Sequence, residues 1–370
     1  MLSLMPFSFL FIFVTFFGTI LSLSSLHWLG IWVGLEINLM GFIPILVYSG
    51  ASQETESGMK YFIIQALGSG MLMAGSLFSY HLTLTWESYL STPSFIGLPI
   101  LIFGLMLKLG SFPFHFWLPG VMAGISWFSC LILTTWQKLA PLFLLMAITS
   151  SYASLHSVLI FFIMAAAAGS SLVGGFGGIN QTQLRALLAY SSIGHMGWML
   201  LCSISSTSAL KVYFITYFII SICVFLALWY SEKSFFLQTG SSSSNTKLNE
   251  LILLTMLLSL GGMPPLLGFF SKWIVIWSFS FTYSFIPLIP LLVGSLVSLF
   301  YYLSLIFSLT LFSGSSYQPY ISYLSLTNMK EHQNFNQFNQ MPSYLLVLVL
   351  MVNLLGGLFI YLMLFIFDFL

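Results

Sequence analysis

Apolar runs of about 20 residues, separated by short polar stretches, follow one another along most of this chain. A run of that length, coiled as a helix, crosses the roughly 30 Å hydrocarbon core of a bilayer. The runs do not show the apolar and polar alternation that is typical of strands in an outer-membrane barrel. The sequence therefore predicts an all-α fold, a polytopic bundle of membrane helices.

Composition excludes a water-soluble domain. Of 370 residues, 59% are apolar or aromatic and 5% are charged, and the mean hydropathy is +1.02. The N-terminal residues "MLSLMPFSFLFIFVTFFGTILSL" have neither a basic start nor a small-residue cleavage site, so we expect a first span rather than a signal peptide. Cys130, Cys202 and Cys223 lie singly in apolar runs, which indicates core packing rather than a metal site.

Polar clusters divide the chain into eleven predicted spans. They lie near residues 5–25, 28–49, 59–81, 95–127, 128–148, 152–178, 182–206, 209–230, 250–276, 284–312 and 343–366. Short loops on the cytoplasmic or matrix side of a membrane hold an excess of Lys and Arg. Most basic residues outside the spans fall on the side of the N-terminus, whereas Lys211 falls on the other. We therefore expect the N-terminus on the positive-inside side.

Two predicted spans cannot be continuous helices. Residues 95–127 would form a helix of roughly 50 Å, too long for one crossing, and "LKLGSFPFHFWLPG" from Leu107 to Gly120 supplies a break. The ninth span contains "GGMPPLLGFFSKW" from Gly261 to Trp273, whose glycines and prolines also interrupt a helix. We expect interruptions near Gly110 to Pro113 and near Gly261 to Pro265.

The two interrupted spans are the fourth and the ninth, which suggests an internal repeat. A repeat with an odd number of helices inverts the topology of its copy, and inverted repeats with broken helices are typical of transporters. We expect a first five-helix repeat in residues 1–148 and an inverted copy in 152–312. A polar loop, 313–342, and a last membrane helix within 343–370 would follow.

Four ionisable side chains are predicted deep within spans: Glu36, Lys108, Lys138 and Lys272. A lysine at the bilayer centre costs about 2.5–3.5 kcal/mol, so each one requires an explanation. They can be structural, as ion pairs or as long side chains that reach the membrane surface. Alternatively, removal from water favours a neutral lysine and a nearby carboxylate favours a charged one, so a lysine under both influences can exchange protons. The helix breaks favour this second interpretation, because they supply free backbone groups and room for water.

Two histidines are candidate proton relays. His115 lies in the first break, and His195 lies in the middle of a span in "YSSIGHMGW". A lone buried histidine is also common in an ordinary core, so that alternative stays open. Because no phosphate loop and no paired cysteine motif is visible, we predict neither a cofactor-binding residue nor a metal ligand in this chain.

Four segments together resemble a known family. They are "LKLGSFPFHFWLPGV", "TWQKLAP", "NQTQLRALLAYSSIGHMGW" and "LSLGGMPPLLGFFSKW". In matching order, from about Trp32 to Trp273, they are similar to the mitochondrially encoded, antiporter-like proton-pumping subunits of respiratory complex I. The rest of the chain is matched only by hydropathy. The resemblance implies proton-handling roles for Glu36, Lys108, Lys138 and Lys272, and His115 and His195 fall within the matching motifs as candidate relays.

The same resemblance implies a single member of a large assembly. Flavin mononucleotide, iron–sulfur clusters and ubiquinone would then be bound by other subunits, and none by this chain. Its partners would be neighbouring antiporter-like and small core subunits and membrane lipids, with no nucleic acid. Its place would be the mitochondrial inner membrane, as a multi-pass protein with its N-terminus in the matrix.

Three other functions remain open on the sequence alone. A free-standing cation/proton antiporter needs oxygen ligands for its cation, and Glu36 is the only clear carboxylate predicted in the hydrocarbon. A b-type cytochrome would use His115 and His195 as axial ligands. An inert membrane spacer would need no buried titratable residues.

Overall fold

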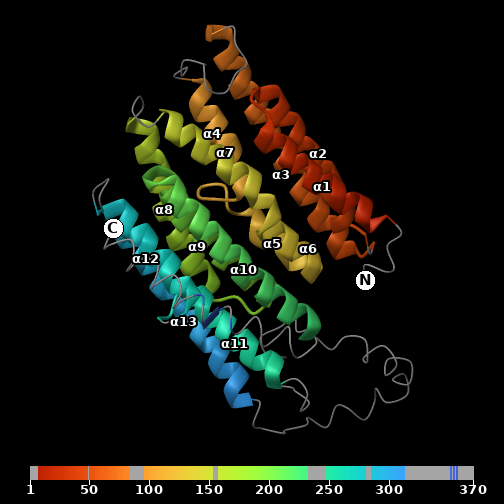
Figure 1. Cartoon of the computed structure of the whole chain (residues 1–370). Coiled ribbons are helices and arrows are strands. Elements are labelled where there is room, and N and C mark those ends of the chain that lie inside the picture. The colour runs from red at the N-terminus through yellow and green to blue at the C-terminus, as the bar shows by residue number, and fades with distance from the viewer. Residues whose placement is uncertain are drawn as a thin grey trace.

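The computed structural model of the chain is a bundle of α-helices lying side by side, with α1–α3 along one edge and α11–α13 along the opposite edge (Figure 1). It describes residues 7–48, 50–83, 96–152, 157–231, 247–264, 266–280 and 285–312, and residues 351, 353, 354 and 356. These described residues contain no β-strand, which confirms the predicted fold class.

Thirteen helices are described. The first seven are α1 (Ser8–Ser24), α2 (Trp28–Leu46), α3 (Ser52–Thr83), α4 (Gly97–Leu109), α5 (Trp117–Gly124), α6 (Trp127–Thr134) and α7 (Trp136–Tyr152). The others are α8 (Ser157–Gly178), α9 (Leu184–Ser205), α10 (Thr207–Ser231), α11 (Lys247–Gly261), α12 (Leu267–Ser280) and α13 (Leu288–Phe312). In the described ranges, seven helical segments are long and apolar enough to cross a membrane.

The first ten predicted spans correspond to these helices. The eleventh, 343–366, and the loop 313–342 lie almost wholly outside the described residues. Of the final segment, Asn353 is described, and its side-chain amide donates to the Thr255 carbonyl of α11 at 3.4 Å. The division into two inverted five-helix repeats stays a prediction.

Both predicted interruptions are confirmed. The chain leaves α4 at Gly110, which adopts the left-handed conformation with φ +68°, and helix resumes only at Trp117. A glycine accepts this conformation without the strain that a side chain would bring. In the ninth span, α11 ends at Gly261 and α12 begins at Leu267, while Pro265 lies outside the described residues.

A third interruption was not predicted. The expected span 128–148 is divided at Thr135 into α6 and α7. The Thr135 hydroxyl donates to the Leu131 carbonyl at 2.6 Å, in competition with the helical ladder, and Pro141 removes a backbone donor from α7. The division falls just before Lys138, so each of the three membrane lysines lies beside a helix interruption.

The third helix begins earlier than predicted, at Ser52 rather than near residue 59. Glu54 in its first turn interacts favourably with the helix dipole. One turn further on, the exposed side chains of Glu56 and Lys60 form an ion pair at 2.6 Å. The charged boundary residues therefore extend the helix instead of forming a loop.

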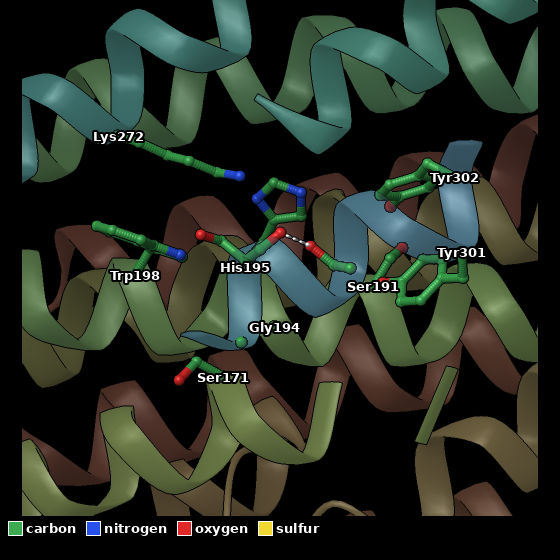
Figure 2. Close-up of a pocket in the computed structure, with 11 residues that line it drawn as sticks. Ser171, Ser191, Gly194, His195, Trp198, Lys272, Tyr301 and Tyr302 are labelled. Atoms are coloured by element: carbon green, nitrogen blue, oxygen red, sulfur yellow. Dashed lines mark hydrogen bonds between the residues drawn. The ribbon is translucent and has the colours of Figure 1, made fainter. Parts of the chain in front are cut away.

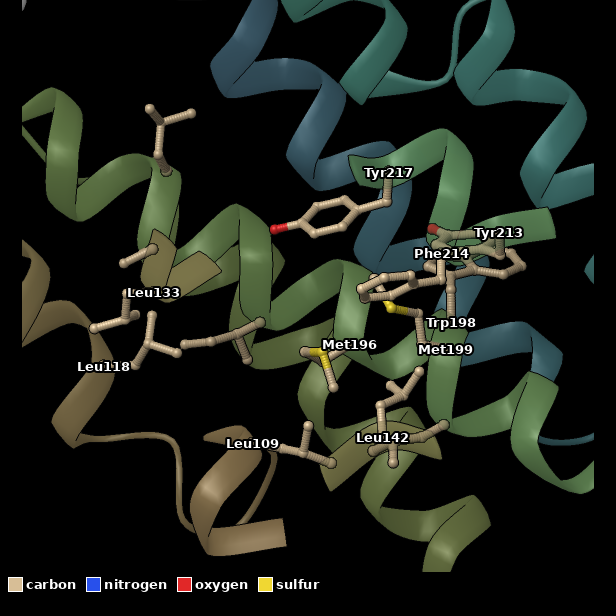
Figure 3. Close-up of a cluster of buried hydrophobic side chains, with 14 of the residues drawn as sticks. Leu109, Leu118, Leu133, Leu142, Met196, Trp198, Met199, Tyr213, Phe214 and Tyr217 are labelled. Atoms are coloured by element: carbon tan, nitrogen blue, oxygen red, sulfur yellow. The ribbon is translucent and has the colours of Figure 1, made fainter. Parts of the chain in front are cut away.

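Apolar and small side chains hold the bundle together. Figure 3 shows Leu109 and Leu118, which flank the first interruption, in one buried cluster with Met196 and Met199 of α9 and Tyr217 of α10. Elsewhere small residues bring helices into close contact, which in a membrane replaces much of the hydrophobic driving force.

The crossing of α8 and α9 is the clearest test of this packing. A Cβ atom on Gly174 of α8 would overlap the backbone of Gly194 of α9, whereas one on Gly70 of α3 would meet no atom within 4 Å. We expect Gly174→Ala to destabilise the fold by about 1–3 kcal/mol, because the helices must separate. Gly70→Ala is the matched control and should be neutral or slightly stabilising. Equal thermal unfolding of the two variants in detergent would contradict this packing.

Candidate functional site

The three predicted membrane lysines are all buried. Lys108, Lys138 and Lys272 expose 7%, 2% and 7% of their surface, and they lie on α4, α7 and α12. Glu36 is half-buried on α2. The protein therefore encloses all three lysine side chains, and their role as structural or proton-carrying residues stays a prediction.

Lys108 is fixed in the last turn of α4, where the helix stops. The Gln65 side chain of α3 donates to the Lys108 carbonyl at 3.4 Å, and the Trp117 indole donates to the Leu107 carbonyl at 3.2 Å. The stem of Lys108 packs against Gly68 of α3, where a Cβ would lie 3.0 Å away. Side chains of two other helices thus satisfy the carbonyls that the break leaves free.

Glu36 lies close enough to Lys108 to act on it electrostatically, although the two form no direct ion pair. Asn38 lies on the same helix and exchanges two hydrogen bonds with Gln137 of α7. The amide of Asn38 donates to Gln137 at 2.8 Å, and the amide of Gln137 donates to Asn38 at 3.0 Å. This amide pair therefore joins α2, which carries Glu36, to α7, which carries Lys138.

Lys138 is held by a neutral carbonyl and an aromatic ring. Its ammonium donates to the Ser192 carbonyl of α9 at 3.3 Å and lies 5.7 Å from the ring centroid of Tyr217 of α10. A cation over the face of a ring is attracted by the ring quadrupole. Both partners stabilise a positive charge without a carboxylate.

His195 lies near both Lys138 and Lys272, and we call Glu36, Lys108, Lys138, His195 and Lys272 the row. Its Nδ1 is hydrogen-bonded to the Tyr213 hydroxyl at 2.9 Å, and its ring lies 5.1 Å from that of Tyr217. It interacts electrostatically with both Lys138 and Lys272. Figure 2 shows the Lys272 side chain extending toward the imidazole. The structure therefore places a titratable ring between two buried lysines.

Lys272 lies directly beside the second interruption. Its ammonium donates to the Gly261 carbonyl, at the end of α11, at 2.9 Å. Gly262 has φ +83°, and a Cβ there would lie 2.7 Å from the ammonium. The break therefore gives the lysine both an acceptor and the space to reach it.

His115 is apart from this group. It lies in the first interruption between aromatic neighbours, with ring centroids 4.0 Å from Phe116 and 6.1 Å from Phe112. Its Nδ1 has no well-aligned hydrogen bond within the described ranges, and the backbone of Pro113 is the polar group that interacts with its ring. The structure shows no contact between His115 and the lysines there, so its relay role stays a prediction.

Sequence reasoning missed the polar residues that support the row. These are Asn38, Gln137, Tyr213 and Tyr217. The sequence did indicate the tyrosines as a candidate polar pair, because "YFITY" places two hydroxyl-bearing rings four residues apart on one face of a helix. The amide pair had no comparable signal, since its members are far apart in the sequence.

The sequence matches the family "NADH:quinone oxidoreductase/Mrp antiporter, TM" over residues 25–300. The chain belongs to this family. The expected resemblance is confirmed, because the match covers both interrupted helices and all four membrane charges.

Curated relatives agree with one another. NADH-ubiquinone oxidoreductase chain 2 of Lumbricus terrestris is 41% identical over 79% of this chain and 83% of its own length. The proteins of the same name from Myxine glutinosa and Locusta migratoria are 40% and 39% identical, each over 79% of this chain and 82% of their own lengths.

Solved structures show the same fold. A chain of respiratory complex I from Thermus thermophilus, solved with bound aureothin, superposes with a TM-score of 0.73 at 27% identity, over 82% of this chain and 70% of that one. A chain of the Mrp complex of Dietzia sp. DQ12-45-1b has a TM-score of 0.72 at 19% identity, over 80% and 59%, and supports the fold alone.

The amide pair between α2 and α7 makes a distinctive stability prediction. Asn38→Leu should destabilise the protein by about 1–3 kcal/mol, because it leaves the Gln137 amide without its partner. The double variant with Gln137→Leu should recover most of the loss, since replacing both partners by apolar groups is nearly neutral. Thermal midpoints of the assembled protein provide the measurement. A double variant that loses the sum of both single effects would contradict a direct pair.

Proposed function

We propose that this chain is the chain 2 subunit of a mitochondrial NADH:ubiquinone oxidoreductase and moves protons through the buried row described above. Membership in the family and the shared name of the curated relatives support the assembly. The row consists of Glu36, Lys108, Lys138, His195 and Lys272.

One observation carries the proton-handling role: His195 lies between two buried lysines that have no carboxylate partner. Among the described residues, the only ion pair joins Glu56 and Lys60, at the exposed end of α3. Ionisable residues inside a membrane pair with one another or with backbone carbonyls, and they mark ion and proton paths. Lys138 and Lys272 donate to backbone carbonyls, so no opposite charge among the described residues fixes their protonation.

Like charges in such a row influence each other strongly, because the surroundings screen them little. A proton on Lys138 disfavours a second proton on His195, and a proton on His195 disfavours one on Lys272. A charge that enters at one end is therefore transmitted as a change in proton occupancy along the row. Glu36, next to Lys108, is the acidic member and can set the occupancy of the first lysine.

The chemistry of this chain is proton transfer alone. We propose that flavin mononucleotide, iron–sulfur clusters and ubiquinone are bound by other subunits of the complex, and that the energy of quinone reduction reaches this chain through its neighbours. Antiporter-like and small core subunits and membrane lipids would be its partners. The shared name of the curated relatives supports the mitochondrial inner membrane as its location, and the chain's basic residues favour an N-terminus on the matrix side.

A free-standing cation/proton antiporter is the less supported alternative. Each curated relative reported above is named as a chain of NADH-ubiquinone oxidoreductase. Within the described ranges, no group of three acidic, histidine or cysteine side chains is placed to hold a metal ion.

Lys272→Met tests whether the row moves protons. Methionine has a similar length and suits an apolar interior, so the complex should still assemble. Coupled proton translocation should fall by about tenfold or more, the scale of losing one positioned acid–base group. Lys211→Met, on the exposed start of α10, is the control and should retain activity. If the assembled Lys272→Met complex translocates protons normally, Lys272 has a structural role and does not carry protons.

Substitutions of Glu36 test whether its negative charge controls the protonation of Lys108. At about 8 Å and an effective dielectric near 20, its attraction for a lysine is about 2 kcal/mol, or roughly 30-fold in proton occupancy. Glu36→Gln should therefore leave Lys108 mostly neutral and reduce coupled translocation more than Glu36→Asp, which keeps the charge.

Glu56→Gln at the exposed end of α3 is the matched control for Glu36→Gln. Both complex abundance and translocation should be measured in the same membranes. If Glu36→Gln lowers abundance but the assembled complex translocates normally, Glu36 is structural.

A further inference from the structure

A small cavity lies between α8, α9, α12 and α13, at the end of the row that the proposed function uses. It offers about 10 Å³ to the centre of a water molecule, which is close to the space that one water requires. Lys272 and His195 line one side of it, and Tyr301 and Tyr302 of α13 line the other (Figure 2). The cavity thus adjoins the last lysine of the row.

The two tyrosines are buried, and no well-aligned hydrogen bond satisfies either hydroxyl in the described part of the chain. Tyr301 exposes 2% of its surface and Tyr302 exposes 1%, and their rings lie 4.7 Å apart. The two hydroxyls lie near each other, and Ser298 lies near that of Tyr301 and Ser191 near that of Tyr302. An unsatisfied buried hydroxyl is costly, and two beside one cavity point to a shared ligand.

We propose that this cavity binds one ordered water, held by the hydroxyls of Tyr301 and Tyr302, that receives or delivers the proton of Lys272. The role in transfer rests on the proposed function, whereas the water site rests only on the geometry.

Water fits this cavity better than an apolar or ionic ligand. A cavity water needs two to four polar partners. Lys272 supplies donors, the tyrosine hydroxyls donate and accept, and the second ring nitrogen of His195 is not used by Tyr213. The volume excludes a larger molecule, and the adjacent ammonium disfavours a cation.

The site would extend the row to α13. His195 and Lys272 come from α9 and α12, so a water between them and the tyrosines connects these helices to a third. A hydroxyl that both accepts and donates can pass a proton through without a lasting charge. Tyr301 and Tyr302 would then be proton-relay residues, in addition to their packing role.

The first test is structural and does not depend on proton pumping. The intact complex should be imaged at a resolution that shows waters, as wild type and as Tyr302→Phe. We expect density for one water in the cavity of the wild type, and its loss or displacement in the variant. A wild-type cavity without a water would overturn the proposal.

The thermal midpoint of the complex is a second, independent measurement on the proposed water site. If the Tyr302 hydroxyl binds a water, Tyr302→Phe removes a hydrogen bond and should lower the thermal midpoint of the complex. If the hydroxyl is unpaired, its removal relieves a buried polar group and should raise the midpoint, which would contradict the site. Tyr190→Phe on α9, outside the cavity lining, is the matched control.

The second test concerns the relay. Tyr301→Phe, Tyr302→Phe and the double variant should lower the protons moved per NADH oxidised in assembled complex, with the double variant lowest. Normal pumping in the double variant, alongside impaired Lys272→Met, would overturn the relay but not the row. If Lys272→Met itself pumps normally, the relay falls with the proposed function, and the density and the thermal midpoints still decide the water site.

Discussion

Every backbone polar group inside a bilayer needs a partner within the protein, and the architecture of this chain depends on that requirement. A continuous helix meets it automatically, whereas an interrupted helix leaves carbonyls that other groups must satisfy. Here the indole of Trp117 and the amide of Gln65 do so at the end of α4, and the ammonium of Lys272 does so at the end of α11. For Lys272, the buried lysine and the helix break therefore stabilise each other.

The row is not uniform along its length. Near Lys108 the carboxylate of Glu36 offsets part of the cost of burying a positive charge. Around Lys138, His195 and Lys272 only carbonyls, hydroxyls and aromatic rings stabilise a positive charge. A second proton in that half meets repulsion from the first, and no carboxylate among the described residues offsets this repulsion.

Much of this fold could be predicted because the bilayer imposes simple rules on sequence. The span lengths, the breaks at Gly110 and Gly261 and the cost of buried lysines all follow from them. The division at Thr135 was missed, because a threonine hydroxyl competes with the helical ladder only weakly and proline is common in membrane helices. The position of His195 between two lysines depends on how three helices pack, which no local pattern encodes. The repeat boundaries and the last span remain predictions.

The bond between Lys272 and the Gly261 carbonyl spans the two halves of a broken helix. An ammonium donates a stronger hydrogen bond than a neutral amine does, so the proton on this lysine contributes to holding α12 against α11. Thermodynamic coupling works equally in both directions. Any force from a neighbouring helix that changes the angle between α11 and α12 must therefore change the lysine's affinity for its proton. At this contact, work done on the angle between α11 and α12 is converted into a change in the free energy of protonation of Lys272.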